Sequence, residues 1–455
     1  MATPPPVTDK LAEFVYQTEF STIPQQTCAN AKLHILDTLG VALAGVDQPA
    51  ANIALAYCEG LGTATEASIW GTRSTAAVST AAFANGLFAH ALDFDDWDAF
   101  IHIGHPTSVL LGAALSLGAN LASSGEALLK AYVVGIEVIA RIAAHAPNVQ
   151  ERGFHSTPVF GSLGAAVACA SLLKLSPEKI KAALAIAASA AGGIQRQQGS
   201  MVKPFHAANA ARNGVEAALL ARAGFTADAA IIEAPRGFCD TFFGPEKCAY
   251  EKMIENLGRP YFLESPGLGL KWHPCSAPQF LAADAALFLK REHNIRYEDV
   301  AKILVSIPPL RYARHYAAEV KTGLRGKFAV NYVVAMCILE GTLDLATFTD
   351  EAVNRPKAQA ALRKVQVICD ETIPEPGPYC PVSVELNDGK RFSYTAKVAK
   401  GHPQNPMTES EVIEKFRGNA SSSISDQQAN DLIAVVQRLE SLAHVGQIAA
   451  LLTPR

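Results

Sequence analysis

The chain has 455 residues, of which 49% are apolar and 18% charged, and 39 basic against 43 acidic side chains give a net charge of −4. This length is two to three times that of a typical domain and favours more than one compact core. The high apolar content excludes a disordered chain. Without a basic tract, neither a nucleic acid nor an anionic membrane has electrostatic support as a partner.

The N-terminal segment has no basic stretch followed by an apolar run and is poor in arginine. We therefore expect no secretory or mitochondrial signal and a cytoplasmic location. The nine cysteines are scattered and form no C-x-x-C pair, so the sequence predicts neither a zinc ribbon nor a thioredoxin-type site. The uncharged stretch 106–125 contains several polar residues and is interpreted as a buried helix, not a membrane span.

The first 250 residues show the apolar periodicity of helices and are rich in Ala and Leu. Thr8 is placed to cap a first helix, and Pro24 can open a second helix that runs to Gly45. Further helices are expected at residues 75–90, 107–122, 127–145, 157–174, 178–191 and 207–223. The small residues Ala, Gly and Ser at many contact positions predict that these helices pack closely.

The pattern changes near Pro266. Strands are expected at 301–307 and 365–369, together with a hairpin whose strands 382–386 and 392–396 flank a turn at 387–390. Helices are expected at about 277–291 and 327–340. This mixture of elements indicates a separate α+β segment.

Beyond residue 403 the chain again shows helical signals. Thr408 with Glu411, and Ser425 with Gln428, form two capping-box patterns. We therefore predict a mainly α protein, in which a smaller α+β lid domain (266–403) is inserted into a large all-α helical domain (1–265 and 404–455). Such an insertion leaves a domain interface, where small-molecule sites usually form.

The densest polar cluster lies at residues 93–98, where four aspartates precede His105. The chain has no P-loop, dinucleotide fingerprint, G-x-S-x-G or H-E-x-x-H motif. Three interpretations of the cluster are open. It is a solvated loop with capping aspartates, a site for a divalent cation, or a general acid/base pair in which an aspartate orients or tunes His105.

Other candidate site residues are spread along the chain. His155 opens an apolar helix, and Lys203 is predicted in a loop before a helix whose first amide groups favour anions. Lys271 lies at the domain junction, and Arg325 belongs to a cationic stretch before Tyr332. Each residue also has a plain structural interpretation, as a hydrogen-bonded histidine or a solvated cation. Together they suit proton transfer next to a carboxylate, because cations offset the charge that builds on the carboxylate oxygens.

The chain resembles the MmgE/PrpD family, in register from about residue 30 to about residue 418. The resemblance is carried by the blocks HILDTLGVALAG, ANGLFAHALDFDD, GHPTS, GFHSTPVFGSLGAA, MVKPFHAANAARNG, LGLKWHPCS, GKFAVNY and GHPQNPMT. The family includes 2-methylcitrate dehydratase, cis-aconitate decarboxylase and iminodisuccinate epimerase. The resemblance implies a large all-α domain, an α+β lid, a homodimer and catalysis without a metal or organic cofactor.

The resemblance also implies roles for single residues. Asp93 in DFDD and His105 in GHP match the acid/base pair of the family, which favours the acid/base interpretation of the aspartate cluster. His155 in GFH and Lys203 in M-x-K-P match active-site positions. A further active-site position is matched by Lys271 in L-K-W, and the lid residue by Tyr332 in F-x-x-x-Y.

We therefore predict a cofactor-independent, dehydratase-like lyase that acts on a small di- or tricarboxylate. His105 is the principal base or acid, and Asp93 sets its tautomer and charge. Tyr332 or His155 handles the second proton. The substrate carboxylates are held by Lys203, Lys271 and Arg325.

Two departures from family patterns bear on the substrate. The decarboxylase pattern has Thr directly after DFDD, where this chain has Trp97, and 2-methylcitrate dehydratases tend to have Asp and Asn after GHPS, where this chain has Thr107, Ser108 and Val109. An epimerase similar to iminodisuccinate epimerase, or a decarboxylase, is the alternative on the same scaffold. A further alternative is a carboxylate-binding protein without catalytic activity.

Overall fold

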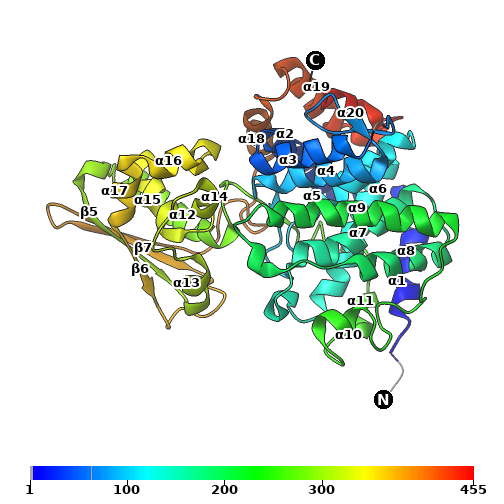
Figure 1. Cartoon of the computed structure of the whole chain (residues 1–455). Coiled ribbons are helices and arrows are strands. Elements are labelled where there is room, and N and C mark those ends of the chain that lie inside the picture. Colours follow the sequence, from blue (N-terminus) through cyan, green and yellow to red (C-terminus); the bar gives the residue numbers. More distant parts are fainter. Residues whose placement is uncertain (1–3, 63, 455) are drawn as a thin grey trace. The chain divides into compact units, whose positions relative to one another are not determined.

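The computed structural model describes residues 4–62 and 64–454 and divides into two compact units (Figure 1). Unit 1 comprises Met1–Leu270 and Thr408–Arg455, and unit 2 comprises Lys271–Met407. The chain is mainly α, as predicted. The sequence patterns place the divisions at residues 265 and 403.

Unit 1 is built almost wholly from helices, whose long members pack on one another. Along its described residues the helices begin with α1 (Val7–Gln17), α2 (Gln25–Gly45), α3 (Pro49–Gly60), α4 (Val78–Ala91), α5 (Pro106–Asn120), α6 (Gly125–Ala144), α7 (Ser156–Leu172), α8 (Pro177–Ala190) and α9 (Val202–Ala223). They are followed by α10 (Phe238–Phe243), α11 (Tyr250–Ile254), α18 (Glu409–Ala420), α19 (Asp426–Gln437) and α20 (Gly446–Leu451). The short strands β1 (Ala67–Ser68) and β2 (Thr75–Ala76) pair with each other, as do β3 (Asp96–Trp97) and β4 (Gly269–Leu270).

Most predicted helices are present, with corrected ends. Both predicted capping boxes, at the starts of α18 and α19, are confirmed. The predicted cap of α1 is wrong, because Thr8 lies inside the helix and its hydroxyl donates to Glu233. Helix α9 begins at Val202, five residues earlier than predicted, so Lys203 lies in its first turn and not in a loop.

Close packing of the central helices α4, α5, α7 and α9 rests on small residues (Figure 1). A Cβ atom on Gly112 of α5 would lie 2.9 Å from the backbone nitrogen of Gly86 on α4. A Cβ atom on Gly214 of α9 would lie 2.3 Å from the Cβ of Ala165 on α7. The helices therefore touch backbone to backbone, as the small residues predict.

We expect Gly214→Ala to destabilise the protein by about 1–3 kcal/mol, because the added methyl group overpacks a rigid helix contact. The melting temperature measures the loss. Gly418→Ala on α18 is the matched control, since nothing lies within 4 Å of a Cβ there. Equal melting temperatures for the two variants would contradict the proposed packing.

His34 on α2 is a buried imidazole whose Nδ1 has no partner among the described residues. Burial, together with the nearby charge of Lys415, lowers its pKa to about 3. The folded protein therefore keeps His34 neutral at pH values where the unfolded chain protonates it. Acidification below pH 6.5 then favours the unfolded state.

For this reason we expect His34→Leu to gain stability relative to the unsubstituted protein as the pH falls. Between pH 7 and pH 5 the difference in unfolding free energy shifts by about 2 kcal/mol in favour of the variant, at about 1.4 kcal/mol per pKa unit below 6.5. Urea unfolding at both pH values measures the shift. A difference that stays constant with pH would show that His34 is not held neutral.

Unit 2 combines one sheet with six helices among the described residues. The strands are β5 (Val300–Ile307), β6 (Val365–Cys369), β7 (Cys380–Leu386) and β8 (Arg391–Ala396), in the spatial order β6-β5-β7-β8. Strands β5 and β6 are parallel, whereas β7 pairs antiparallel with both β5 and β8, which confirms the predicted hairpin. The helices are α12 (Phe280–Glu292), α13 (Pro309–His315), α14 (Gly323–Gly326), α15 (Val330–Glu340), α16 (Asp350–Asn354) and α17 (Pro356–Arg363).

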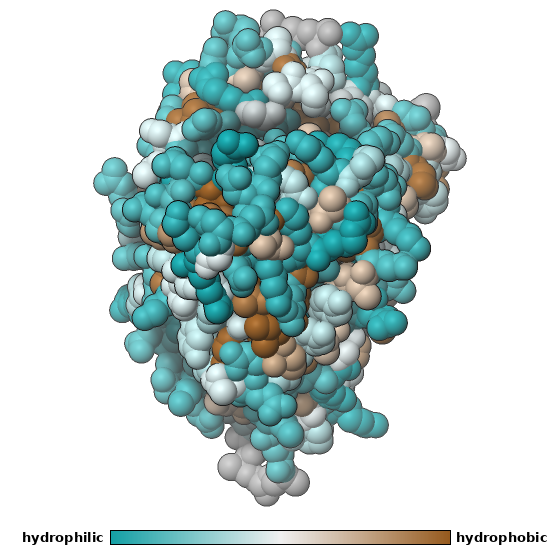
Figure 2. Space-filling model, turned by 90° about the vertical axis from the view of Figure 1, so that its left-hand side faces the viewer, coloured by the Kyte–Doolittle hydropathy of each residue, from teal (hydrophilic) through white to brown (hydrophobic). Residues whose placement is uncertain are grey.

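Apolar surface is limited on the face shown in Figure 2, which is mostly hydrophilic and is interrupted by small hydrophobic groups. Exposed large apolar side chains of unit 2 include Ile368, Tyr394 and Val398. Among the described residues, no single helix is long and apolar enough to cross a membrane. The helices α2 and α3 pass that test only as a pair bent by 86°.

Candidate active site

The predicted acid/base residues lie in and around the segment that joins α4 to α5. Asp93 follows the end of α4, and its backbone has a φ of 51°, in the left-handed region that costs most residues free energy. Its buried Oδ1 accepts a hydrogen bond from Lys203 Nζ at 2.6 Å and lies 3.6 Å from His105 Nε2. Lys203, 110 positions from Asp93 in the sequence, and His105 therefore meet at this one carboxylate.

The imidazole of His105 has a defined orientation. Its Nδ1 lies 2.6 Å from the backbone carbonyl oxygen of Asp96. Because a carbonyl oxygen only accepts, Nδ1 carries a hydrogen, and the lone pair of the neutral ring is on Nε2, which faces Asp93. The prediction that Asp93 sets this tautomer is therefore wrong, since the carbonyl of Asp96 sets it. Asp93 can still stabilise the protonated ring.

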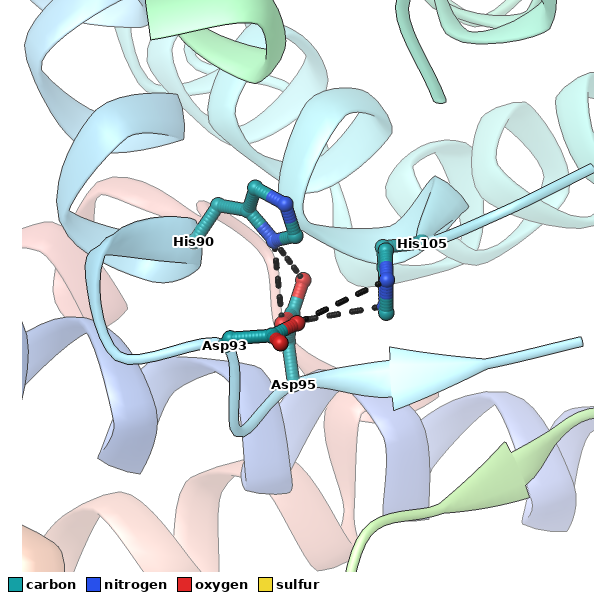
Figure 3. Close-up of side chains that lie close together, drawn as sticks. All are labelled: His90, Asp93, Asp95 and His105. Atoms are coloured by element: carbon teal, nitrogen blue, oxygen red, sulfur yellow. Dashed lines mark hydrogen bonds and ion pairs between the residues drawn. The ribbon is translucent and has the colours of Figure 1, made fainter. Parts of the chain in front are cut away.

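A second carboxylate–imidazole pair lies beside the first (Figure 3). His90, on the last turn of α4, places Nδ1 2.8 and 3.0 Å from the two carboxylate oxygens of Asp95. The rings of His90 and His105 have centroids 4.7 Å apart. Burial lowers the pKa of His90, which favours a neutral ring that donates from Nδ1. The ring of His90, held by Asp95, thus packs against the ring of His105.

The other two aspartates of the cluster, Asp96 and Asp98, accept hydrogen bonds from backbone amide groups. The Asp96 carboxylate accepts from the backbone nitrogen and hydroxyl of Thr107, at the start of α5. Burial and the neighbouring Asp95 raise the pKa of Asp96 well above its ordinary value. Asp98 accepts hydrogen bonds from three backbone amides, those of Phe100, Ile101 and Ile103. The cluster therefore contains capping aspartates as well as an acid/base site.

His155 is joined to a histidine that the sequence did not single out. His155 precedes α7, and its Nδ1 lies 3.1 Å from Nδ1 of His206 on α9. Burial, followed by the charge of Lys203, lowers the pKa of His155 well below its ordinary value. Burial and the nearby His90 and Lys203 lower the pKa of His206 to about 4. Both rings are therefore neutral near pH 7.

Three predicted site residues belong to unit 2. Lys271 is buried, and Arg325 is partly buried with its guanidinium 3.4 Å from the carbonyl oxygen of Tyr316. Tyr332 has no exposed surface, and its hydroxyl donates to the carbonyl of Thr347 at 2.7 Å. In this structure the Tyr332 hydroxyl has a structural partner, so we assign no proton transfer to it. Substrate binding by Lys271 and Arg325 stays a prediction.

The groups around Asp93 also have the chemistry of a metal site. His90, Asp93, Asp95 and His105 each offer one ligand atom, and these atoms lie within 4.8 Å of one another (Figure 3). Imidazole and carboxylate are suitable zinc ligands. However, the Lys203 ammonium already neutralises Asp93 at 2.6 Å. A divalent cation would have to compete with this ion pair.

We therefore expect a chelator such as EDTA to leave turnover unchanged, because Lys203 already provides the positive charge that the site needs. Added Zn²⁺ should inhibit reversibly by displacing the ammonium from Asp93. Initial rates after chelation, with and without added Zn²⁺, measure both effects. Activity that disappears on chelation and returns with metal would contradict this view.

A partly buried imidazole, a buried carboxylate and a buried ammonium lie together here and have the chemistry of a general acid/base site. Residues 9–251 match the MmgE/PrpD N-terminal domain, and residues 273–441 match the MmgE/PrpD C-terminal domain. The chain therefore belongs to the MmgE/PrpD family, which confirms the resemblance seen in the sequence.

Curated relatives match over nearly the full length. Cis-aconitate decarboxylase of Homo sapiens is 30% identical over 98% of this chain and 94% of that protein. The enzyme of Mus musculus is also 30% identical, over 98% and 93%. The cis-aconitate decarboxylase-like protein oryM of Aspergillus oryzae is 29% identical, over 98% and 97%.

Three residues that the structure places at the site were given no individual role in the prediction from sequence. His90 and His206 were not singled out, and Asp95 was recognised only as one of the four clustered aspartates. His90 is the penultimate residue of α4, and His206 lies one turn after Lys203 on α9. His206 could have been found if α9 had been predicted to start at Val202. Residues three apart, such as Lys203 and His206, share one face only when the segment is helical.

Proposed function

We propose that this protein is a cofactor-independent lyase that decarboxylates a small unsaturated tricarboxylate of the cis-aconitate type. The observation that supports this proposal is the Asp93 carboxylate held between the Lys203 ammonium and His105 Nε2. The names of the relatives support the choice of substrate class. The site supplies the two things that such a reaction needs, a cation for a substrate carboxylate and groups that transfer a proton.

In the proposed reaction the bond between one carboxylate carbon and its neighbouring carbon breaks. Carbon dioxide leaves, and the electron pair passes into the adjacent unsaturated acid. A proton from the site then forms a new carbon–hydrogen bond, so that one proton is consumed for each carbon dioxide released. Lys203 stabilises the negative charge that develops on the remaining carboxylate oxygens. Protonated His105, whose charged form Asp93 stabilises, or the N–H group of neutral His155 supplies the proton.

The test is to incubate the purified protein with cis-aconitate in D₂O and follow the products by NMR. We expect carbon dioxide release and one solvent deuteron on carbon in the five-carbon product. Hydration of the double bond without gas release would instead identify a hydro-lyase. Binding, seen as a thermal shift without any product, would identify a carboxylate-binding protein.

A second candidate is a hydro-lyase or epimerase on the same site. Trp97 favours it, because this bulky residue stands where the decarboxylase pattern has Thr. Trp97 lies in β3, opposite Gly269 of β4, within a segment that continues directly to the site. Citrate-like and iminodisuccinate-like acids in D₂O test this candidate. Deuterium exchange at carbon without net loss of substrate identifies an epimerase.

Our proposal also retains three predictions. Unit 2 acts as a lid, Lys271 and Arg325 bind substrate carboxylates, and the protein works as a homodimer. Replacing either cation with Met should raise KM with a smaller effect on kcat, because lost ground-state binding appears mainly in KM. Light scattering of the purified protein measures the oligomeric state.

A further inference from the structure

The aspartate-rich segment between α4 and α5 is held by a lysine of the C-terminal helix α18. Lys415 Nζ donates to the backbone carbonyl oxygen of Phe94 at 2.8 Å. The same ammonium lies 3.8 Å from the centroid of the Phe94 ring, within the range of a cation–π contact. Phe94 stands between Asp93 and Asp95 in the sequence. One cation therefore holds both the backbone and the side chain of the residue that joins these two aspartates.

Lys415 is itself fixed by a buried carboxylate. Its Nζ lies 2.8 Å from Oδ1 of Asp37 on α2, and the Asp37 side chain has no exposed surface. The helix that carries Lys415 packs closely on α2, because a Cβ atom on Gly40 would lie 3.1 Å from the Cα of Phe416. A buried ion pair between two closely packed helices has little freedom to move. The ammonium therefore occupies a defined position beside the aspartate-rich segment.

Asp93 needs such support because its own backbone conformation is unfavourable. Its φ of 51° lies in the left-handed region, which costs free energy and persists only where the surroundings impose it. The Phe94 carbonyl belongs to the peptide group that leads to Asp95, whose carboxylate lies 2.8 Å from Nδ1 of His90. Fixing that peptide group therefore restricts the chain directly after Asp93 and directs Asp95 toward His90.

We infer that Lys415 is a positioning residue of the acid/base site, which acts through Phe94 and is anchored by Asp37. By holding the Phe94 carbonyl, it keeps the Asp93 carboxylate where it meets the ammonium and the imidazole of the site. The inference rests on the proposed function, because the position of Asp93 affects turnover only if this carboxylate takes part in the reaction. A displacement of about 1 Å in such a group can lower the rate by about 10²-fold.

Substitutions at both ends of the ion pair separate positioning from stability. Lys415→Met removes the ammonium and leaves the Asp37 carboxylate uncompensated, so we expect both a lower melting temperature and a lower kcat. Adding Asp37→Asn to this variant removes the buried charge, and the melting temperature should then recover. The kcat of the double variant should stay about 10²-fold low with little change in KM, because the Phe94 carbonyl still lacks its donor.

Two single variants complete the comparison. Asp37→Asn alone keeps an oxygen acceptor for Lys415, so the ammonium stays beside Phe94 and kcat should remain within about 10-fold of its original value. Lys32→Met is the matched control, because Lys32 also joins α2 to the C-terminal segment, through the carbonyl of Gln437 at 2.8 Å and the Glu440 carboxylate. This control should leave kcat unchanged. All rates are measured well below the lowest melting temperature, so that unfolding does not contribute.

A purely structural role of Lys415 predicts a different pattern. In that case kcat recovers together with the melting temperature in the double variant, and this result would overturn the inference. If Met is not tolerated, Lys415→Gln combined with Asp37→Asn is the second pair, since the Gln amide ends one bond short of the ammonium. It should show the same loss of kcat, and an unaltered kcat would again overturn the inference.

A crystal structure of the double variant tests the inference without any substrate. We expect the peptide group after Phe94 to rotate and the Asp93 carboxylate to leave its present position, 2.6 Å from Lys203 Nζ. An unchanged Asp93 would refute the inference even if the protein is an active decarboxylase. Inactivity of the unsubstituted protein on every acid tested would refute only the proposed function.

Discussion

We expect His105→Ala to lower kcat/KM for the acid substrate by about 10³-fold, within the range for loss of a general acid or base. The Nε2 atom of His105 lies 3.6 Å from the Asp93 carboxylate, and its Nδ1 is already bound to the carbonyl oxygen of Asp96. Steady-state rates with the confirmed substrate measure the loss.

Stability should change little in the same variant. The His105 ring is part of the loop surface of the site, with 14% of its side chain exposed, and it is not part of the central helix packing. We expect the melting temperature to fall by only a few degrees. His145→Ala, which removes an imidazole from outside the site, is the matched control. Retention of turnover by His105→Ala would remove His105 from the mechanism.

Lys203→Met produces the second large effect, on both stability and activity. Removing one partner of a buried ion pair leaves the other charge uncompensated and costs about 3–5 kcal/mol. Both Lys203 and Asp93 are buried, and their charged atoms are 2.6 Å apart. We expect a clear fall in melting temperature together with loss of kcat, because Asp93 becomes protonated and no longer stabilises charged His105.

A double variant separates these two consequences. Adding Asp93→Asn to Lys203→Met removes the uncompensated carboxylate, so the melting temperature should recover while turnover stays lost. The coupling between the two substitutions follows from a double-mutant cycle. If Lys203 only anchors substrate, the single variant instead shows a raised KM, an unchanged kcat and an unchanged melting temperature.

Much of the fold could be predicted because its signals are local. Apolar periodicity identified most of the helices, and alternation around Gly389 identified the hairpin of β7 and β8. Helix α3 was missed, and Thr8 was given a capping role that its bond to Glu233 excludes. That bond joins residues 225 positions apart, and no local pattern contains such information.

The candidate site could be predicted only in part for the same reason. Family motifs led to Asp93, His105, His155 and Lys203, and the structure brings these residues into one cluster. The separate roles of the four aspartates could not be predicted. The backbone carbonyl of Asp96 orients His105, whereas the Asp96 side chain accepts a hydrogen bond from Thr107. Backbone groups carry no sequence signature.

The C-terminal segment has a consequence for how the protein is made. Lys415 of α18 lies 2.8 Å from buried Asp37 of α2 and donates to the carbonyl of Phe94, which directly follows Asp93. During translation, every proposed site residue is therefore synthesised before Lys415, whose ammonium group binds the carbonyl of Phe94 in the aspartate-rich segment. A chain that ends before residue 415 should therefore fold without that support. We therefore expect chains that end before residue 415 to be less active than the full chain.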